Sequence, residues 1–68
     1  MTFGTTLRKQ RERQRMPQAL LADLSGVTQP TISSWESDLT KPTIDDLKRL
    51  AKALEIPAAT FFEENPAN

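Results

Sequence analysis

Apolar residues recur along the chain with the three- and four-residue spacing of amphipathic helices, and this pattern predicts five helices and no strands. The clearest apolar stripe follows Thr43, which together with Asp46 resembles the capping box that begins many helices. The stripe predicts the fourth helix and consists of Ile44, Leu47, Leu50, Ala51 and Leu54.

The first two helices are bounded by residues that cap or end a helix. A first helix is predicted over residues 3–15, with Thr2 as its cap and Pro17 beyond its end. A second helix is predicted over residues 18–25. It stops at Gly26, because glycine tolerates the left-handed conformation that commonly follows a helix.

The third helix is predicted over about residues 28–37. Thr28 can accept a hydrogen bond from a first-turn amide, and Pro30 falls in the first turn, where a missing N–H costs little. Trp35 follows Ile32 by three residues and therefore lies on the same inward face. We interpret this tryptophan as a core residue and not as a base-stacking side chain.

A polar loop follows the third helix, and a short fifth helix is predicted to begin at residues 56–57. Its aromatic residues Phe61 and Phe62 are predicted to close the base of the core. Residues 1–64 are therefore expected to form one domain, and residues 65–68 are expected to be a frayed C-terminal tail.

The composition argues against several classes of function. The chain has 68 residues with no cysteine and no histidine, so it lacks thiolate ligands, the usual imidazole ligand and the usual general base. Its two glycines form no phosphate-binding loop. We expect no catalytic residue, no metal site and no cofactor. No apolar run approaches the roughly 20 residues of a membrane span, so we expect a cytoplasmic protein with no membrane partner.

The formal net charge is zero, but the charge is divided unevenly along the sequence. Residues 1–16 hold five basic side chains and one acidic side chain, whereas residues 17–68 hold four basic and eight acidic ones. Because neutralised phosphates supply most non-specific affinity for nucleic acid, the basic segment is a candidate binding face. The same arginines also suit a solvated helix surface, so charge alone does not decide between these interpretations.

The segment 18–36 is the most informative part of the chain. It predicts two short helices joined at Gly26, the second of which turns Ile32 and Trp35 inward. To read base edges in the major groove of DNA, a protein needs a short, supported helix with hydrogen-bonding side chains on its exposed face. The predicted outward side chains are of this kind: Gln29, Thr31, Ser33 and Ser34.

An ordered series of residues matches the pattern of a known family. The series comprises Leu7-Arg8, Arg11, Gln18, Leu21-Ala22, Gly26-Val27, Thr31-Ile32-Ser33, Trp35-Glu36, Lys41-Pro42, Leu47, residues 50–54 and Phe62. At this spacing the chain resembles the phage-repressor and Cro type of helix-turn-helix DNA-binding domain, also called the xenobiotic-response-element type. The resemblance implies an all-α, compact five-helix, lambda-repressor-like fold, with the helix-turn-helix formed by the second and third helices.

The resemblance also implies a sequence-specific, repressor-like regulator that places its third helix in the major groove of double-stranded DNA. Gln29 resembles the glutamine that opens the recognition helix and pairs with adenine, and the other base contacts implied are Thr31, Ser33 and Ser34. Gln18 resembles the glutamine that binds a phosphate at a helix start. The expected phosphate contacts are Gln18, Arg8, Arg13, Arg15, Thr28, Ser37 and Lys41.

Two matching residues imply a structural role instead. Arg11 and Glu36 resemble an ion pair that ties the first helix to the third, and we expect this role because a paired guanidinium is already satisfied. The chain departs from the family pattern elsewhere. Pro30 and Ser34 stand where longer polar readers are frequent, so base readout is expected to be thin and to depend partly on DNA shape.

Two functional interpretations follow. The first is a DNA-binding regulator that binds as a homodimer to a two-fold operator and associates with the nucleoid. The second is a protein-interaction module, or an antitoxin-type partner protein, that keeps the fold but has weak DNA affinity. The second interpretation is motivated by the zero net charge and by three leucines expected on the surface, Leu20, Leu24 and Leu39.

Overall fold

The computed structural model describes residues 1–63, which form five helices and no strand, and it confirms the all-α prediction. Residues 65–68, which were predicted to fray, lie outside the described part of the chain. The helices are α1 (Phe3–Arg13), α2 (Gln18–Ser25), α3 (Gln29–Glu36), α4 (Ile44–Leu54) and α5 (Ala59–Glu63).

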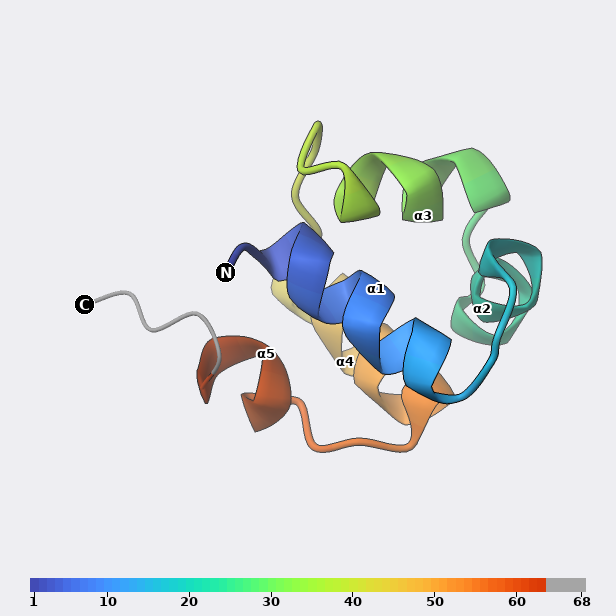
Figure 1. Ribbon diagram of the computed structural model, residues 1–68. Coiled ribbons are helices and arrows are strands. Elements are labelled where there is room, and N and C mark those ends of the chain that lie inside the picture. The colour runs from blue at the N-terminus through green and yellow to red at the C-terminus, as the bar shows by residue number, and fades with distance from the viewer. Residues whose placement is uncertain (64–68) are drawn as a thin grey trace.

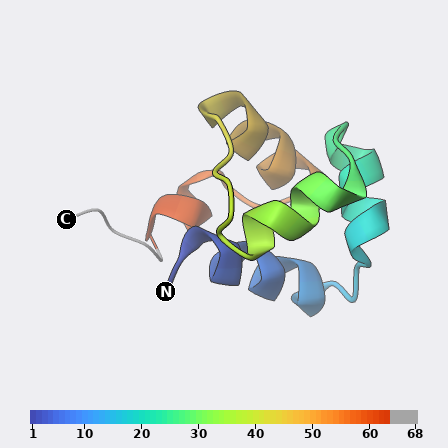
Figure 2. The same ribbon diagram turned by 90° about the horizontal axis from the view of Figure 1, so that it is seen from above.

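The helices surround one core and leave α3 on the outside. In Figure 1, α1 lies at the front and α4 behind it, while α3 crosses above them. Figure 2 shows the same arrangement from above, with α2 at one end of the molecule and α5 at the other. Helix α2 packs against both α3 and α4, and α1 packs against α3 and α5. Helix α3 is therefore supported from below by two other helices.

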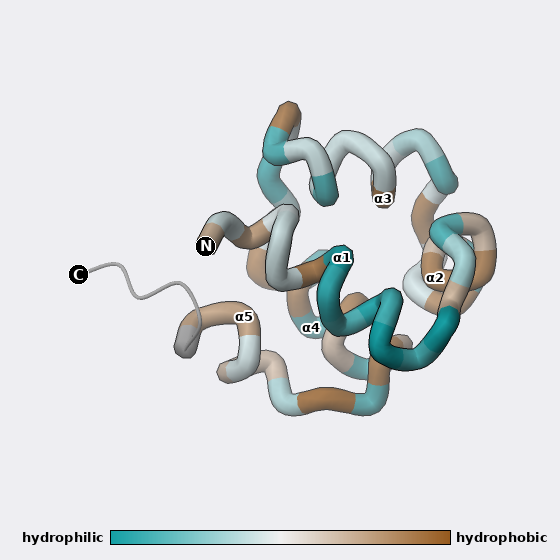
Figure 3. The backbone as a smooth tube through the Cα atoms, in the orientation of Figure 1, coloured by the Kyte–Doolittle hydropathy of each residue, from teal (hydrophilic) through white to brown (hydrophobic). Residues whose placement is uncertain are grey.

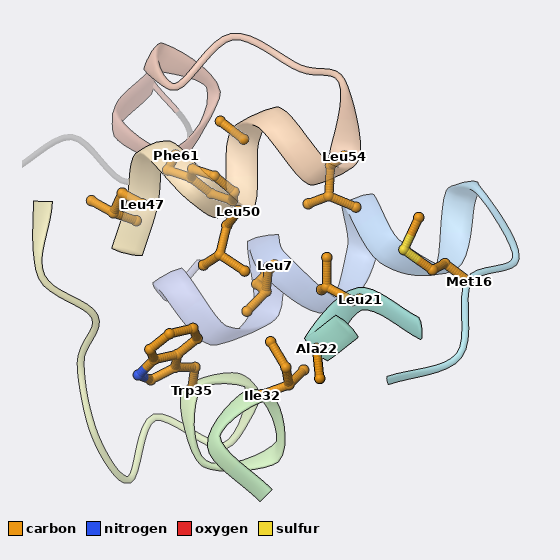
Figure 4. Close-up of a cluster of buried hydrophobic side chains, with 11 residues drawn as sticks. Leu7, Met16, Leu21, Ala22, Ile32, Trp35, Leu47, Leu50, Leu54 and Phe61 are labelled. Atoms are coloured by element: carbon orange, nitrogen blue, oxygen red, sulfur yellow. The ribbon is translucent and has the colours of Figure 1, made fainter. Parts of the chain in front are cut away.

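The core is built from the apolar stripes that the sequence predicts. Figure 4 shows these side chains converging from all the helices onto the space between α1, α3 and α4. Trp35 and Ile32 point into this space from α3, and Trp35 is only 4% exposed. The most deeply buried apolar side chains are Leu7, Leu21, Ile32, Leu50 and Leu54.

Three helices begin at a threonine that accepts a hydrogen bond from the third residue of its helix. Thr2 caps α1, Thr28 caps α3 and Thr43 caps α4. At Thr43 the Asp46 carboxylate also accepts from the Thr43 amide at 3.0 Å, which completes the predicted capping box. Each such cap typically stabilises a helix by about 1 kcal/mol.

The C-terminal ends of the first four helices are followed by residues with left-handed backbone conformation. Gly26 supplies it after α2, as predicted, and Arg15, Asp38 and Glu55 supply it elsewhere. The predicted first helix over residues 3–15 is therefore too long. Arg15 has φ 53°, and its amide already donates to the Glu12 carbonyl in the closing turn, so the helix ends at Arg13.

The fifth helix differs from the prediction in two respects. It begins at Ala59 and not at residues 56–57, and Phe62 is 52% exposed instead of closing the core. Adjacent residues of a helix point about 100° apart, so a single short helix cannot bury both aromatic rings against one surface. Phe61 takes the buried position and lies against Phe3, with 5.3 Å between ring centroids.

The start of α1 approaches the end of α3 more closely than a side chain would allow. A Cβ atom at Gly4 would lie within 2.6 Å of the Trp35 carbonyl oxygen and closer still to that of Glu36. The Gly4 amide also donates to Asp38 Oδ1 at 3.0 Å, in the turn after α3. Glycine is therefore required at this position by backbone contact, a constraint that the sequence analysis missed.

A buried carboxylate joins the first three helices. The Glu36 side chain is fully buried, and Arg11 of α1 donates to both of its oxygens, with Nε 2.6 Å from Oε2 and Nη2 3.1 Å from Oε1. Arg8 and Gln18 also donate to Oε1, at 3.4 and 3.0 Å. Because the third Arg11 nitrogen, Nη1, donates to the Met16 carbonyl at 2.7 Å, this guanidinium also holds the turn between α1 and α2.

The charge state of Glu36 follows from two opposing effects. Burial raises the pKa of this carboxyl, but the hydrogen bonds from Arg11, Gln18 and Arg8 and the positive charge of Arg11 lower it, and the net pKa falls below its ordinary value of 4.5. A carboxyl whose pKa is lower in the folded state stabilises the fold above the unfolded-state pKa. This contribution disappears as the pH falls through the folded-state pKa.

We expect Glu36→Gln to lower the free energy of unfolding at neutral pH by about 3–5 kcal/mol, because it leaves a buried guanidinium without its partner. Urea unfolding across a pH series should show this deficit to be constant above pH 4.5 and to shrink in more acidic solution. Carbon-13 NMR titration of the Glu36 carboxyl in the wild-type chain gives the folded-state pKa directly. A value at or above 4.5 would contradict the account.

We expect Gly4→Ala to destabilise the fold by about 1–3 kcal/mol, because the new methyl group forces the backbones of α1 and α3 apart. Lys9→Ala, an exposed change in the same helix, is the control and should shift the urea midpoint little. Equal midpoints for Gly4→Ala and wild type would show that the two backbones are not held at this distance.

Candidate nucleic-acid interface

Helix α3 exposes its polar side, which begins at Gln29 and is called its polar edge below, to solvent. No other element lies over this helix in the view of Figure 2, and Figure 3 shows that its backbone carries mostly polar residues. Gln29 is exposed, while Thr31, Ser33 and Ser34 are half-buried. Because Ile32 and Trp35 face the core, the helix has one apolar side and one side rich in hydroxyl and amide groups.

The turn between α2 and α3 is held by short hydrogen-bonding side chains and glycine. Gly26 has φ 75° and closes α2, after which Thr28 is extended and caps α3. The Thr28 hydroxyl lies 3.4 Å from the Thr31 amide and 2.9 Å from the Thr31 hydroxyl. Pro30 occupies the first turn, where α3 lacks an internal acceptor for its N–H, so the proline fits without loss.

Two of the predicted contact residues are joined to each other. Gln29 Nε2 donates to Gln18 Oε1 at 2.7 Å, and Gln18 Nε2 donates to Glu36 Oε1 at 3.0 Å. Gln29, the predicted base contact, is thus connected through Gln18, the first residue of α2, to the buried Glu36 carboxylate. The two glutamines are 11 positions apart in different helices, so no local sequence signal indicates this bond.

The predicted phosphate-binding cations lie on two separate segments, namely α1 with the turn after it and the loop after α3. Figure 3 shows a continuous hydrophilic stretch over the second half of α1, which includes the exposed Arg13 and leads to the exposed Arg15 in the turn before α2. Arg8 contacts Glu36 through Nε and keeps half of its side chain exposed. Lys41 is exposed in the loop between α3 and α4. The structure therefore joins Arg8 to α3 through Glu36 and leaves Arg13, Arg15 and Lys41 exposed.

The loop after α3 is fixed to the start of α1. Asp38 has φ 61°, and the hydrogen bonds from the Thr2 side chain and the Gly4 amide lower the pKa of its carboxyl. Ser37, which follows the last residue of α3, is exposed. Leu39 is 78% exposed and lies in this loop, at the opposite end of α3 from α2, where Leu20 and Leu24 are exposed. The three leucines therefore do not share one element.

Residues 1–63 show no group of three acidic, cysteine or histidine side chains close enough to hold a metal ion. Within the same residues, none of the helices is both long and apolar enough to cross a bilayer. The adjacent carboxylates at positions 45 and 46 lie in the first turn of α4, where Asp46 completes the cap and pairs with Arg49. They stabilise a helix start and show no arrangement for chemistry.

Known proteins share both the sequence pattern and the fold. A helix-turn-helix family model matches residues 7–61. Among solved structures, the restriction-modification controller protein C.AhdI from Aeromonas hydrophila has a TM-score of 0.86 at 30% identity, covering 88% of this chain and 91% of that one. The P22 c2 repressor in complex with a synthetic operator has a TM-score of 0.84 at 31% identity, covering 90% and 92%.

A curated relative from Mycobacterium tuberculosis, the "uncharacterized HTH-type transcriptional regulator" Rv0474, is 39% identical over 59 residues, which cover 87% of this chain and 42% of the relative. The chain therefore spans less than half the length of this relative. Because the family match covers most of the residues and the fold agrees with that of repressor and controller proteins, the chain belongs to the helix-turn-helix family, in its phage-repressor and Cro type.

Proposed function

We propose that this chain is a transcriptional regulator that binds double-stranded DNA in a sequence-specific manner with α3 in the major groove. The observation that carries the proposal is the polar edge of α3, on which Gln29 is held at a defined place by Gln18. The P22 c2 repressor, solved with its operator, supports the proposal because its fold superposes on this one with a TM-score of 0.84.

Gln29 is the main base-reading residue in this proposal. Its amide has the donor and acceptor that match adenine N7 and N6, whereas Thr31, Ser33 and Ser34 reach a base edge only where the helix approaches closely. None of these four side chains can make the bidentate arginine contact that reads guanine. Direct readout is therefore narrow, and the deformability of the DNA contributes to the choice of site.

We assign the phosphate contacts to the segments that precede and follow α3 and to α1. The start of α2 presents Gln18, and the turn before α3 presents Thr28, so both can meet one backbone strand. Lys41 and Ser37 follow α3 and suit the strand on the other side of the groove. The remaining proposed phosphate contacts are the arginines associated with α1, namely Arg8, Arg13 and Arg15.

The active form in this proposal is a homodimer on a two-fold operator with half-sites about 34 Å apart, one turn of the double helix. A single α3 of eight residues covers too few base pairs to select one site in a genome, and a second copy doubles the number of positions read. Such binding would associate the protein with the nucleoid.

A second candidate function is that of a protein-interaction or antitoxin-type partner with weak DNA affinity. Leu20 and Leu24 favour it, because they are 45% and 55% exposed one turn apart on α2. Leu24 also lines a groove that Arg49 and Glu55 border between α2 and α4. This surface lies on α2 and α4 and not on α3, so a partner there need not displace DNA.

We expect Gln29→Ala to weaken binding to the preferred operator by about 1–3 kcal/mol and to abolish base preference at one position of each half-site. Selection of bound duplexes from a random pool, run in parallel on wild type and variant, measures both effects. An unchanged preference at every position would remove Gln29 from base readout. Absence of any enriched sequence with wild type would favour the second candidate function.

We expect Arg13→Ala to weaken binding to all duplexes by a similar factor and to reduce the slope of log affinity against log salt by about 1, because one fewer phosphate is neutralised. Titrations at several salt concentrations with specific and scrambled duplexes measure the slope. Arg49→Ala is the matched control, since this arginine pairs with Asp46 on α4 and should leave the slope unchanged. Equal slopes for Arg13→Ala and wild type would contradict the phosphate role.

A further inference from the structure

Asp38 stands in the loop after α3 at a position where glycine would be the simpler residue. Its φ of 61° lies in the left-handed region, which glycine adopts without strain and aspartate only at some cost. After α2, the same kind of conformation is supplied by Gly26, with φ 75°. The backbone alone therefore gives no reason for a carboxylate at position 38, so the contacts of the carboxylate have to account for it.

The Asp38 carboxylate caps a helix whose first turn lies 34 positions earlier in the sequence. Oδ1 accepts from the amide of Gly4 at 3.0 Å, while Thr2 accepts from the amide of Thr5 in the same turn of α1. The first amides of a helix lack internal acceptors and carry a partial positive charge, so they favour a carboxylate here. Hydrogen bonds from the Thr2 side chain and the Gly4 amide lower the pKa of Asp38, which is therefore ionised at neutral pH.

The bond to Gly4 attaches the loop between α3 and α4 to the start of α1. Toward α4, the next anchor is Thr43, whose amide donates to Asp46 at 3.0 Å in the cap of that helix. Between the two anchors, Lys41 borders a hollow together with Phe3 of α1. The loop therefore runs along the first turn of α1, and Asp38 holds one end of this path.

Both phosphate contacts proposed for this loop lie close to the attachment. Ser37 directly precedes Asp38, and Lys41 follows it by three residues. Both are exposed, and the positive charge of Lys41 is near enough to Asp38 to contribute to the lowering of its pKa. A loop that loses an attachment samples more conformations, so fixing its lysine on a phosphate then costs more conformational entropy.

We infer that Asp38 is a positioning residue for the phosphate contacts of this loop, because its bond to the Gly4 amide holds Ser37 and Lys41 where they can meet the DNA backbone. The inference rests on the proposed function, since it concerns the same surface, and it adds the first turn of α1 as a support of that surface. It predicts a result opposite to that of charge alone. Removing a carboxylate beside DNA should strengthen binding by electrostatics, whereas removing the Asp38 side chain should weaken it.

The test compares Asp38→Gly with Asp38→Asn. Asp38→Gly keeps the left-handed backbone, and with it the fold, but removes the acceptor for the Gly4 amide. Asp38→Asn removes the charge but keeps an oxygen that can accept from this amide, in a residue that tolerates the same backbone. Glu55→Gly is the matched control, because Glu55 is an exposed carboxylate with φ 57° in the turn after α4. It removes the same charge from the same conformation at another place.

Each protein is titrated at several salt concentrations with a duplex that wild type selects from a random pool and with a scrambled duplex. We expect Asp38→Gly to bind both about three- to tenfold more weakly and to reduce the slope of log affinity against log salt by about 1, as Lys41→Ala does. Adding Lys41→Ala to Asp38→Gly should change the slope no further. Asp38→Asn should bind at least as tightly as wild type, and Glu55→Gly should keep the wild-type slope.

Three outcomes would overturn the inference. Binding by Asp38→Gly that is as tight as wild type or tighter would make Asp38 only a charge near the DNA. Equal weakening by Asp38→Gly and Asp38→Asn would show that the retained acceptor has no effect. A lower urea midpoint for Asp38→Gly with an unchanged salt slope would assign the bond to stability alone.

Hydrogen exchange of the Gly4 amide in the free protein separates this inference from the proposed function. First-turn amides are otherwise unprotected, so this amide should exchange slowly in wild type and Asp38→Asn and faster in Asp38→Gly. Fast exchange in wild type overturns the inference whatever the DNA assays show. A protected amide in a protein that binds neither duplex overturns the inference and the proposed function together. DNA binding by wild type with the same salt slope in Asp38→Gly overturns the inference alone.

Discussion

The structure depends above all on the burial of one negative charge, the Glu36 carboxylate. An isolated charge in a protein interior would be strongly unfavourable. This one persists because Arg11 approaches Oε2 within 2.6 Å and further donors, Arg8 and Gln18, reach Oε1. Those donors come from α1 and α2, so satisfying the charge fixes where α3 lies relative to both helices. The buried carboxylate needs several donors at fixed places. This need also fixes the position of α3, because a shifted α3 would leave buried donors and acceptors unpaired.

Backbone constraints reinforce this arrangement at both ends of α3. At its start, Gly26 and the Thr28 cap set the angle between α2 and α3. At its end, contact with the bare backbone at Gly4 and the bond to Asp38 bring α1 against the last turn. With its apolar residues Ile32 and Trp35 anchored, the helix has only one side left to face solvent, and that side carries short hydroxyl groups and one amide. The zero net charge of the chain conceals an uneven division along the sequence, since residues 1–16 hold five basic side chains and one acidic side chain.

The sequence predicted the number of helices, most of their bounds and the buried face of α3, because these follow from periodicity, caps and glycine, which act over a few residues. Prediction from the sequence failed where two neighbouring residues competed for one position, or where contacts join residues that are far apart in the sequence. Adjacent phenylalanines both looked apolar enough for the core, but a five-residue helix could bury only Phe61. Nothing in the sequence around Arg15 indicates that this residue adopts a left-handed conformation after α1. The close approach at Gly4 and the Gln18–Gln29 bond join residues from different helices, and such contacts exist only once the fold has formed.

The central claim is that Glu36 and its hydrogen-bond donors Arg8, Arg11 and Gln18 hold α3 in place. In this position the side of α3 that carries the Gln29 amide can enter duplex DNA. The most direct test is a crystal structure of the chain with a duplex recovered by selection from a random pool. The account predicts α3 in the major groove, the Gln29 amide paired with an adenine, and Gln18 still bound to Glu36. A complex in which α3 lies away from the groove, or in which Glu36 has released Gln18 while Gln29 reads its base, would contradict it.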